Sequence, residues 1–243
     1  MNITREFSGK ISRIWRNAGH GMTPRSAIQG TWIDVGAHHG EITLRHATQS
    51  PALRVFAFEP NLPVAAKLMG CASNYFVIPM AIAETDGIAK LHVNEFDAAS
   101  SLLPFNQESL KAWIGGESLK VNSIVTVPTI RLDTFMSLAG IESVDYLKID
   151  AQGADLAVIK SAGDRLRDIA RITLEVDITP IRLYAGAPSK DEVVGFLKDV
   201  GFSLIRAEAQ SNAQEENLTF IHAGRFHRLR DAEPAHPIKS ERR

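Results

Sequence analysis

The chain has 243 residues, of which 44% are hydrophobic and 23% are charged, and its formal net charge at pH 7 is −1. This composition is typical of a globular protein with a sizeable core, and it excludes general disorder. The length fits one large domain or two small ones. Cys71 is the single cysteine, so a disulfide within the chain and a zinc site built on several cysteines are both excluded.

The charge is unevenly distributed along the chain. Residues 1–30 contain five Lys or Arg and one Glu, and residues 225–243 contain six basic and three acidic residues, which leaves 16 basic and 24 acidic residues in 31–224. An acidic body argues against nucleic acid as the main partner. We therefore divide the chain into a basic N-terminal segment (1–30), a central domain (31–224) and a basic tail (225–243) that is poor in large apolar residues.

The N-terminal segment contains one expected helix. Residues 3–18 place five apolar residues three or four positions apart, which predicts an amphipathic helix that either packs on the domain or contacts a membrane surface or a partner. Residues 1–15 lack the continuous apolar stretch that a secretory signal requires, so we expect none, and no apolar run approaches the roughly 18 residues of a membrane span. We expect a cytoplasmic protein whose basic ends are candidates for peripheral contact with the inner face of the membrane.

From Thr31 onward, short apolar runs alternate with helix-like segments, as in a parallel α/β sheet covered on both faces. A polar loop separates the last two runs, which predicts an antiparallel hairpin at the end of the fold. A less regular insert lies between residues 88 and 131 and has two strand candidates, 88–93 and 121–132. The other expected strands cover residues 31–35, 53–58, 74–81, 144–150, 170–176, 202–207 and 217–223.

The segment TWIDVGAHHGEITL (31–44) carries the first chemical motif. A buried strand ends at Asp34, a turn containing Gly36 and Gly40 follows, and a helix is expected to begin near Glu41. The glycines let the backbone approach a ligand closely, and the helix N-terminus presents free N–H groups. Neither phosphate-binding fingerprint, G-x-G-x-x-G or G-x-x-x-x-G-K-[ST], is present. The acid before the turn favours a ligand with hydroxyls and a cationic amino-acid end, such as S-adenosylmethionine.

A second acid ends the next expected strand. Glu59 follows Gly40 by 19 residues, close to the spacing of about 20 at which a Rossmann-like fold places the acid that binds ribose hydroxyls. The alternative is a solvated loop carboxylate. Pro60 prevents the strand from running smoothly into the next helix.

Two further strand ends are rich in polar residues. Lys148, Asp150 and Gln152 surround one of them, and Glu175 and Asp177 end another. Ligands bind at the carboxyl edge of an open α/β sheet, so these side chains are site candidates. The structural alternatives are a Lys148–Asp150 ion pair and exposed acids at a strand end.

An ordered series of motifs over about residues 31–177 resembles the FkbM family of S-adenosylmethionine-dependent methyltransferases. The resemblance implies the class I methyltransferase fold, which is Rossmann-like, with helices on both sides of a seven-stranded and mostly parallel sheet that has one antiparallel strand near its edge. The terminal hairpin expected above agrees with that fold. The motifs read DVGAHHGEIT, FAFEP, MAIAETDGIAKLHV, SSLL, VPTIRLDTF, VDYLKIDAQGADLAVIKSA and ITLEV.

The resemblance also implies roles for single residues. Glu59, followed by Pro60, matches the ribose acid, Ala81 and Ile82 fall in the segment near the adenine, and Ser100 and Ser101 match a family motif. The cofactor loop is matched by Asp34, Gly36, His38 and Gly40, and the methyl-transfer site by Lys148, Asp150 and Gly153.

Two positions depart from the family pattern. His38 and His39 stand where the family commonly has Asn and a hydrophobic residue, a change that we expect to alter the cofactor pocket. Gln152 stands where the family commonly has Glu. That change removes a carboxylate from the active-site edge, which disfavours a mechanism using this acid as a base or as a metal ligand.

Methyl transfer to a hydroxyl needs alignment of donor and acceptor and removal of a proton. Asp150 is the first candidate for the base, with Lys148 beside it, and Glu175 and His92 are further candidates, although His92 also fits an exposed strand residue. His38 and His39 share no obvious partner in sequence, so we expect neither a metal site nor a catalytic dyad.

The leading hypothesis is an S-adenosylmethionine-dependent O-methyltransferase acting on a secondary metabolite or glycoconjugate, with a sugar hydroxyl of a glycolipid as the specific acceptor. One alternative is a protein that binds S-adenosylmethionine without catalysis, which Gln152 suggests. The other is an NAD-dependent oxidoreductase, which the missing G-x-G-x-x-G disfavours.

Overall fold

The structure is a computed structural model that describes residues 28–180 and 182–228. The predicted amphipathic helix over 3–18 and the tail beyond residue 228 lie outside the described residues. In the described part of the chain, no helix combines the length and the apolar character needed to cross a membrane.

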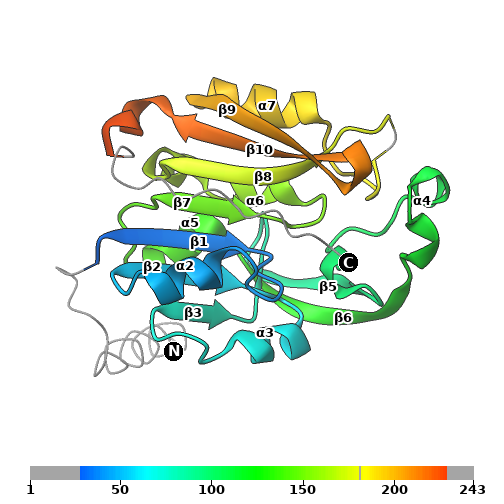
Figure 1. Cartoon of the computed structure of the whole chain (residues 1–243), viewed down its shortest axis with the longest axis horizontal. Helices are drawn as coiled ribbons and strands as arrows, with labels where there is room; N and C mark the ends of the chain where they lie inside the picture. The colour runs from blue at the N-terminus through cyan, green and yellow to red at the C-terminus, as the bar shows by residue number, and fades with distance from the viewer. Residues whose placement is uncertain (1–27, 181, 229–243) are drawn as a thin grey trace, which may run out of the picture.

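The main sheet has seven strands in the order β3-β2-β1-β7-β8-β10-β9 (Figure 1). Neighbouring strands from β3 to β8 are parallel, whereas β10 runs antiparallel to both β8 and β9. The predicted mostly parallel sheet with a C-terminal antiparallel hairpin is therefore confirmed. The strands are β1 (Gly30–Val35), β2 (Leu53–Phe58), β3 (Tyr75–Ile78), β7 (Tyr146–Ile149), β8 (Arg171–Asp177), β9 (Phe202–Gln210) and β10 (Glu215–His222).

Helices cover both faces of the sheet, and Figure 1 shows α2 on the near side and α5 and α6 on the far side. Double coverage explains why the inner strands are almost continuously apolar. Ile33, Ile149 and Leu174 are buried at their centre in the largest core cluster. The helices are α2 (Thr43–Gln49), α3 (Leu62–Leu68), α4 (Gln107–Ala112), α5 (Leu132–Leu138), α6 (Asp155–Lys160) and α7 (Lys190–Asp199), with short 3₁₀ turns η2 (Asp97–Ala99), η3 (Gly116–Ser118), η4 (Gly163–Asp168), η5 (Ser211–Ala213) and η6 (Ala223–Arg228).

The insert forms a second sheet of three strands, β4 (Ala81–Ile82), β5 (Gly87–Asn94) and β6 (Val121–Ile130), in the order β4-β6-β5. The prediction of one continuous strand over 74–81 is wrong, because the chain leaves the main sheet after Ile78 and joins the small sheet at Ala81. Pro79 stands between these strands, and it has no N–H with which to continue the ladder. This break carries the chain into the insert, which lies beside the end of the main sheet where β1 terminates (Figure 1).

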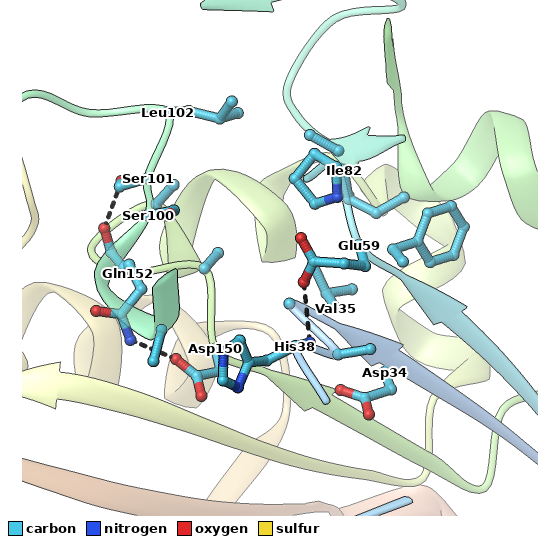
Figure 2. A pocket seen from close by; sticks show the side chains of 18 of the residues that line it. Asp34, Val35, His38, Glu59, Ile82, Ser100, Ser101, Leu102, Asp150 and Gln152 are labelled. Atoms are coloured by element: carbon cyan, nitrogen blue, oxygen red, sulfur yellow. Dashed lines mark hydrogen bonds between the residues drawn. The ribbon is translucent and has the colours of Figure 1, made fainter. Parts of the chain in front are cut away.

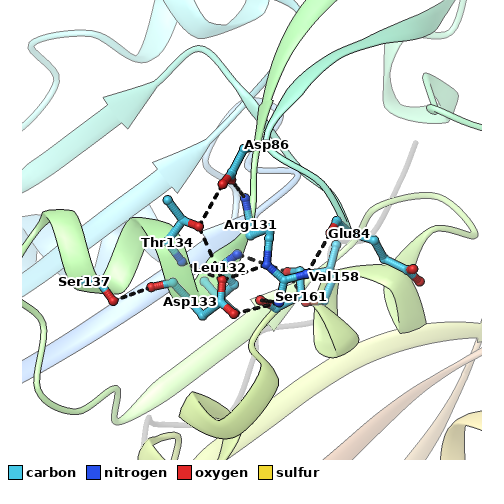
Figure 3. Close-up of polar contacts among 9 residues, drawn as sticks. All are labelled: Glu84, Asp86, Arg131, Leu132, Asp133, Thr134, Ser137, Val158 and Ser161. Carbon is cyan, nitrogen blue, oxygen red and sulfur yellow. Dashed lines mark hydrogen bonds and ion pairs between the residues drawn. The ribbon is translucent and has the colours of Figure 1, made fainter. Parts of the chain in front are cut away.

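Arg131 fastens the small sheet to the main body (Figure 3). Its guanidinium donates to both oxygens of Asp133 at 2.9 and 2.6 Å, to the Glu84 carbonyl at 2.7 Å and to the Ser161 carbonyl at 3.1 Å. Its backbone N–H donates to Asp86 at 2.7 Å. These bonds join the end of β6 to α5, to the end of α6 and to the β4–β5 turn, and so they fix the insert over the edge of the main sheet.

Candidate active site

A cavity of about 270 Å³ opens at the carboxyl ends of β1, β2 and β7, where the small sheet and η2 form its other wall. The strand order reverses between β1 and β7, and such a switch point is the usual ligand site of an open α/β sheet. Ten of the predicted site residues line this cavity: Asp34, Gly36, His38, Glu59, Pro60, Ala81, Ile82, Ser101, Lys148 and Asp150.

Gly40, His92, Gly153 and Glu175 do not line it, whereas Ser100 and Gln152 do. Gly40 belongs to the same loop, but its backbone packs against Leu44 and Leu68, where a Cβ would approach the Leu44 Cβ to 2.9 Å. Glu175 lines a separate cavity of about 20 Å³, which shares Gln152 with the larger one. Burial, and then the negative charges of Asp150 and Glu215, raise the pKa of Glu175 to about 9. Its environment therefore favours the protonated carboxyl over the carboxylate that a base requires.

The turn after β1 touches the end of β7. Gly36 has φ 70°, and a Cβ on it would lie 1.9 Å from the Asp150 carbonyl oxygen. The backbone N–H groups of Gly36 and Ala37 both donate to the Phe58 carbonyl at 3.0 Å. Only glycine tolerates both this backbone conformation and this contact, and the close approach brings the ends of β1, β2 and β7 together around the cavity.

Glu59 is 7% exposed and is held by backbone donors. One carboxylate oxygen accepts from the His38 N–H at 2.9 Å, and the other accepts from the Asn61 N–H at 2.8 Å. Burial raises the pKa of Glu59, and these two donors oppose the increase. Each oxygen keeps further acceptor capacity toward the cavity, so the carboxylate is oriented to receive two hydroxyls.

Lys148 is the buried cation of the site. Its Nζ donates to the Gly36 carbonyl at 2.7 Å and lies 3.2 Å from Asp34 Oδ1 and 3.6 Å from Asp150 Oδ2. Burial alone would lower the pKa of Lys148, but the carboxylates of Asp34 and Asp150 together raise it above its ordinary value. The structure thus shows the ion pairs that were the structural alternative, and it shows them at the wall of the cavity.

Gln152 organises the opposite side of the cavity (Figure 2). Its Nε2 donates to Asp150 Oδ1 at 2.6 Å and lies 3.5 Å from Glu175 Oε2, while the Tyr184 hydroxyl donates to its Oε1 at 2.7 Å. The Ser101 hydroxyl donates to its backbone carbonyl at 2.7 Å. The Asp150 carboxylate can only accept, so it fixes which end of the amide faces it. Gln152 is therefore a donor that orients Asp150, a role that the comparison with the family's Glu did not suggest.

His38 and His39 do share a partner, so the expectation that they have none is wrong. His38 Nε2 lies 2.9 Å from Asp97 Oδ1, and His39 Nε2 lies 3.3 Å from Asp97 Oδ2. His38 Nδ1 lies 2.7 Å from Glu41 Oε1. Burial lowers the pKa of His38, but Asp97 and Glu41 outweigh it, and the net shift is upward. Asp97 comes from the insert, 59 residues after His38, so no spacing in the sequence points to this contact.

Apolar side chains form the rest of the cavity wall, and the sequence did not predict most of them as site residues. Figure 2 shows Ile82 next to Glu59 on one side, with Leu102, Ser101 and Gln152 on the other. The apolar lining residues to which the sequence assigned no role are Val35, Ala37, Ile42, Phe58, Met80, Leu91, Ala98, Leu102, Ala151 and Ala154. A flat aromatic ring fits between such side chains.

The strand order, the antiparallel β10 and the cavity at the β1–β7 switch point are together those of a class I methyltransferase. Residues 34–204 match the family described as Methyltransferase FkbM domain. The chain belongs to this family of S-adenosylmethionine-dependent methyltransferases.

Relatives are similar over different parts of this chain. 2-O-methyltransferase NoeI of Sinorhizobium fredii is 29% identical over 145 residues, which are 55% of this chain and 58% of NoeI. AMB antimetabolite synthetase AmbE of Pseudomonas aeruginosa is 27% identical over 233 residues, which cover 82% of this chain and 10% of AmbE. The chain therefore spans less than two thirds of either relative. Among solved structures, Aeropyrum pernix fibrillarin is similar with a TM-score of 0.44 and 14% identity, covering 79% of this chain and 66% of fibrillarin.

The Gly36 contact predicts a large loss of stability in Gly36→Ala. The matched control is Gly70→Ala, because Gly70 has φ 81° and no atom within 4 Å of its would-be Cβ. Both substitutions place alanine in the left-handed region, at a cost of about 1–2 kcal/mol. Only Gly36→Ala makes a Cβ clash with backbone atoms. We therefore expect the free energy of unfolding of Gly36→Ala, measured with urea, to be at least about 2 kcal/mol lower than that of the control. Equal free energies of unfolding would contradict the contact.

Proposed function

We propose that the protein is an O-methyltransferase that uses S-adenosylmethionine to methylate a hydroxyl of a secondary metabolite or glycoconjugate, with a sugar hydroxyl as the specific acceptor. The observation that carries the proposal is the Asp150 carboxylate, whose side chain is 38% exposed and lies at the cavity between two donors. A hydroxyl is a weak nucleophile and benefits from such a base. The 2-O-methyltransferase NoeI, at 29% identity, supports transfer to oxygen.

The residues around the cavity fit the cofactor. Glu59 would bind the ribose hydroxyls through the acceptor capacity that its two backbone donors leave free. Ile82 and Leu102 would contact the adenine. Asp34 Oδ1 is buried at the cavity and, apart from its ion pair with Lys148, accepts no hydrogen bond from the described residues. An acidic group there suits the cationic amino-acid end of the cofactor, which when bound supplies an electrophilic methyl group.

Asp150 would receive the proton of the acceptor hydroxyl. Gln152 holds one carboxylate oxygen at 2.6 Å, and Lys148 lies 3.6 Å from the other, so the carboxylate is oriented before the acceptor arrives. Such preorientation lowers the reorganisation needed in the transition state. Glu175 does not fit this role, because it lies outside the cavity and burial raises the pKa of its carboxyl.

Glu59→Gln and Asp150→Asn should separate binding from chemistry. Glu59→Gln removes a charged acceptor, and hydrogen bonds to charged groups contribute about 1.5–3 kcal/mol, so calorimetry should show S-adenosylmethionine binding at least about tenfold weaker. Asp150→Asn should keep the affinity within a few-fold and lower methyl transfer to a panel of sugar and phenolic acceptors by about 10²–10⁴.

The exposed Glu117→Gln is the matched control and should change neither quantity. Unchanged affinity in Glu59→Gln would refute the ribose assignment, and undiminished transfer in Asp150→Asn would refute the assignment of Asp150 as the base.

The alternative of an NAD-dependent oxidoreductase predicts nicotinamide binding, which the same calorimeter measures. Family membership favours methyl transfer over hydride transfer.

Gln152→Glu tests whether the amide is part of a working site. It replaces the N–H donor at 2.6 Å from Asp150 with a third carboxyl beside Asp150 and Glu175. Like charges this close raise the pKa of the group that holds the proton, so the acid limb of the pH–rate profile should move to higher pH and transfer at pH 7 should fall about tenfold. The alternative of a non-catalytic binding protein predicts the opposite, with no turnover in the natural chain and turnover in the variant.

The basic ends suggest that the acceptor is a glycolipid at an anionic membrane. Polybasic segments are attracted to anionic lipid by about 1 kcal/mol per Lys or Arg near the surface. Removing residues 1–20 and 227–243 should therefore weaken binding to vesicles containing anionic lipid while leaving S-adenosylmethionine affinity unchanged. Equal vesicle binding by the full and shortened chains would refute this location.

A further inference from the structure

The proposed reaction leaves one cluster at the cavity rim without a role. His38 and His39 come from the turn after β1, and Asp97 comes from η2 in the insert. His38 has φ 47°, and its ring centroid lies 4.0 Å from that of His39, so these sequence neighbours point to the same side. Two imidazoles and a carboxylate from distant segments therefore meet at one point.

Distances within the cluster suit a metal ion. Zinc binds imidazole nitrogen and carboxylate oxygen at about 2.0–2.2 Å in a tetrahedron, so two of its ligand atoms stand about 3.3 Å apart. His39 Nε2 lies 3.3 Å and His38 Nε2 lies 2.9 Å from oxygens of Asp97. One ligand atom from each of the three residues can be chosen so that all lie within 4.8 Å of one another.

Glu41 provides a second, independent sign of a metal ligand. Histidine ligands commonly donate their other ring N–H to a carboxylate, which fixes the tautomer, and His38 Nδ1 lies 2.7 Å from Glu41 Oε1. If Nδ1 donates to Glu41, Nε2 of the neutral ring presents a lone pair toward Asp97. A lone pair and a carboxylate oxygen 2.9 Å apart repel each other unless a proton or a cation lies between them.

We propose that His38, His39 and Asp97 form a binding site for a divalent transition-metal ion such as Zn²⁺. Two imidazoles and one carboxylate favour zinc, nickel or copper over magnesium or calcium, which prefer all-oxygen sites. The three side chains are 24%, 37% and 35% exposed, so an ion can enter from solvent and keep a fourth position open. The site adjoins the cavity proposed for the cofactor, since His38 and Asp97 line that cavity, but none of its three side chains is proposed to take part in methyl transfer.

A bound metal ion would connect two segments at the rim of the cavity. These are the turn after β1, which follows a strand of the main sheet, and η2, which lies in the insert. The backbone N–H of His38 also donates to Glu59, so the ion would steady the segment that orients the proposed ribose acid. A ligand that binds only the folded chain raises its melting temperature, which gives a readout that does not depend on activity.

In the test, the full chain is first treated with a chelator to remove bound metal ions. It is then titrated with Zn²⁺ in a calorimeter and, separately, with Co²⁺ while visible absorption is recorded. We expect one equivalent to bind, a Tm increase with Zn²⁺, and Co²⁺ bands of a four- or five-coordinate site. His39→Ala and Asp97→Asn should each weaken Zn²⁺ binding at least tenfold. His46→Ala, which removes a histidine from α2 away from the cluster, should not.

His39 does not line the cavity, so S-adenosylmethionine affinity in His39→Ala should stay within about twofold of the natural chain. Failure of the metal site is thereby distinguishable from failure of the proposed function. The proposal would be overturned by the absence of stoichiometric Zn²⁺ binding, or by binding that His39→Ala and Asp97→Asn weaken no more than His46→Ala does.

Discussion

The arrangement of the cavity depends on one buried ammonium group. Lys148 Nζ binds the Gly36 carbonyl and lies within ion-pair distance of Asp34 and Asp150, so a single cation holds together the ends of β1 and β7. Removing one partner of a buried ion pair leaves an uncompensated charge and costs about 3–5 kcal/mol. The pairing also explains how two acids can stand at the wall of one cavity: the ammonium group of Lys148 lies within ion-pair distance of both carboxylates.

The sequence predicted features that depend on residues close together along the chain, and it did not predict contacts between distant segments. β2 was predicted at Leu53–Phe58 and the terminal hairpin was predicted in the right order, because continuous burial and a polar turn are local patterns. Asp34, Glu59 and Asp150 were found because parallel strands deliver their carboxyl ends to one edge, whereas Ala81, Ile82 and Ser101 came from the family resemblance alone. Asp97 and Tyr184 were missed, since each reaches the site through tertiary packing and neither stands in a motif. Pro79 indicates a break in the predicted strand 74–81, but it stands within an apolar run that by itself is typical of one continuous strand.

Gln152 shows why a departure from a family pattern cannot be interpreted without its neighbours. On sequence alone, Gln for Glu removes a carboxylate. In the structure, the Asp150 carboxylate can only accept, so the amide nitrogen of Gln152 must face it, and the amide oxygen lies 2.7 Å from the Tyr184 hydroxyl. A carboxylate at 152 could accept from Tyr184 equally well, but it would leave Asp150 and Glu175 without a donor between them. The amide thus places a neutral donor between Asp150 and Glu175.

His38 connects the proposed ribose acid to the proposed metal site. Its backbone N–H orients Glu59, while its ring lies between Glu41 and Asp97. Any change in what occupies the ring's Nε2, whether a proton or a metal ion, acts on the same short turn that supports the proposed ribose acid. Asn, the common family residue here, also suits the left-handed backbone but offers no imidazole. Histidine at this position therefore adds a chemistry that the shared fold does not require, and it adds it at the entrance to the cofactor cavity.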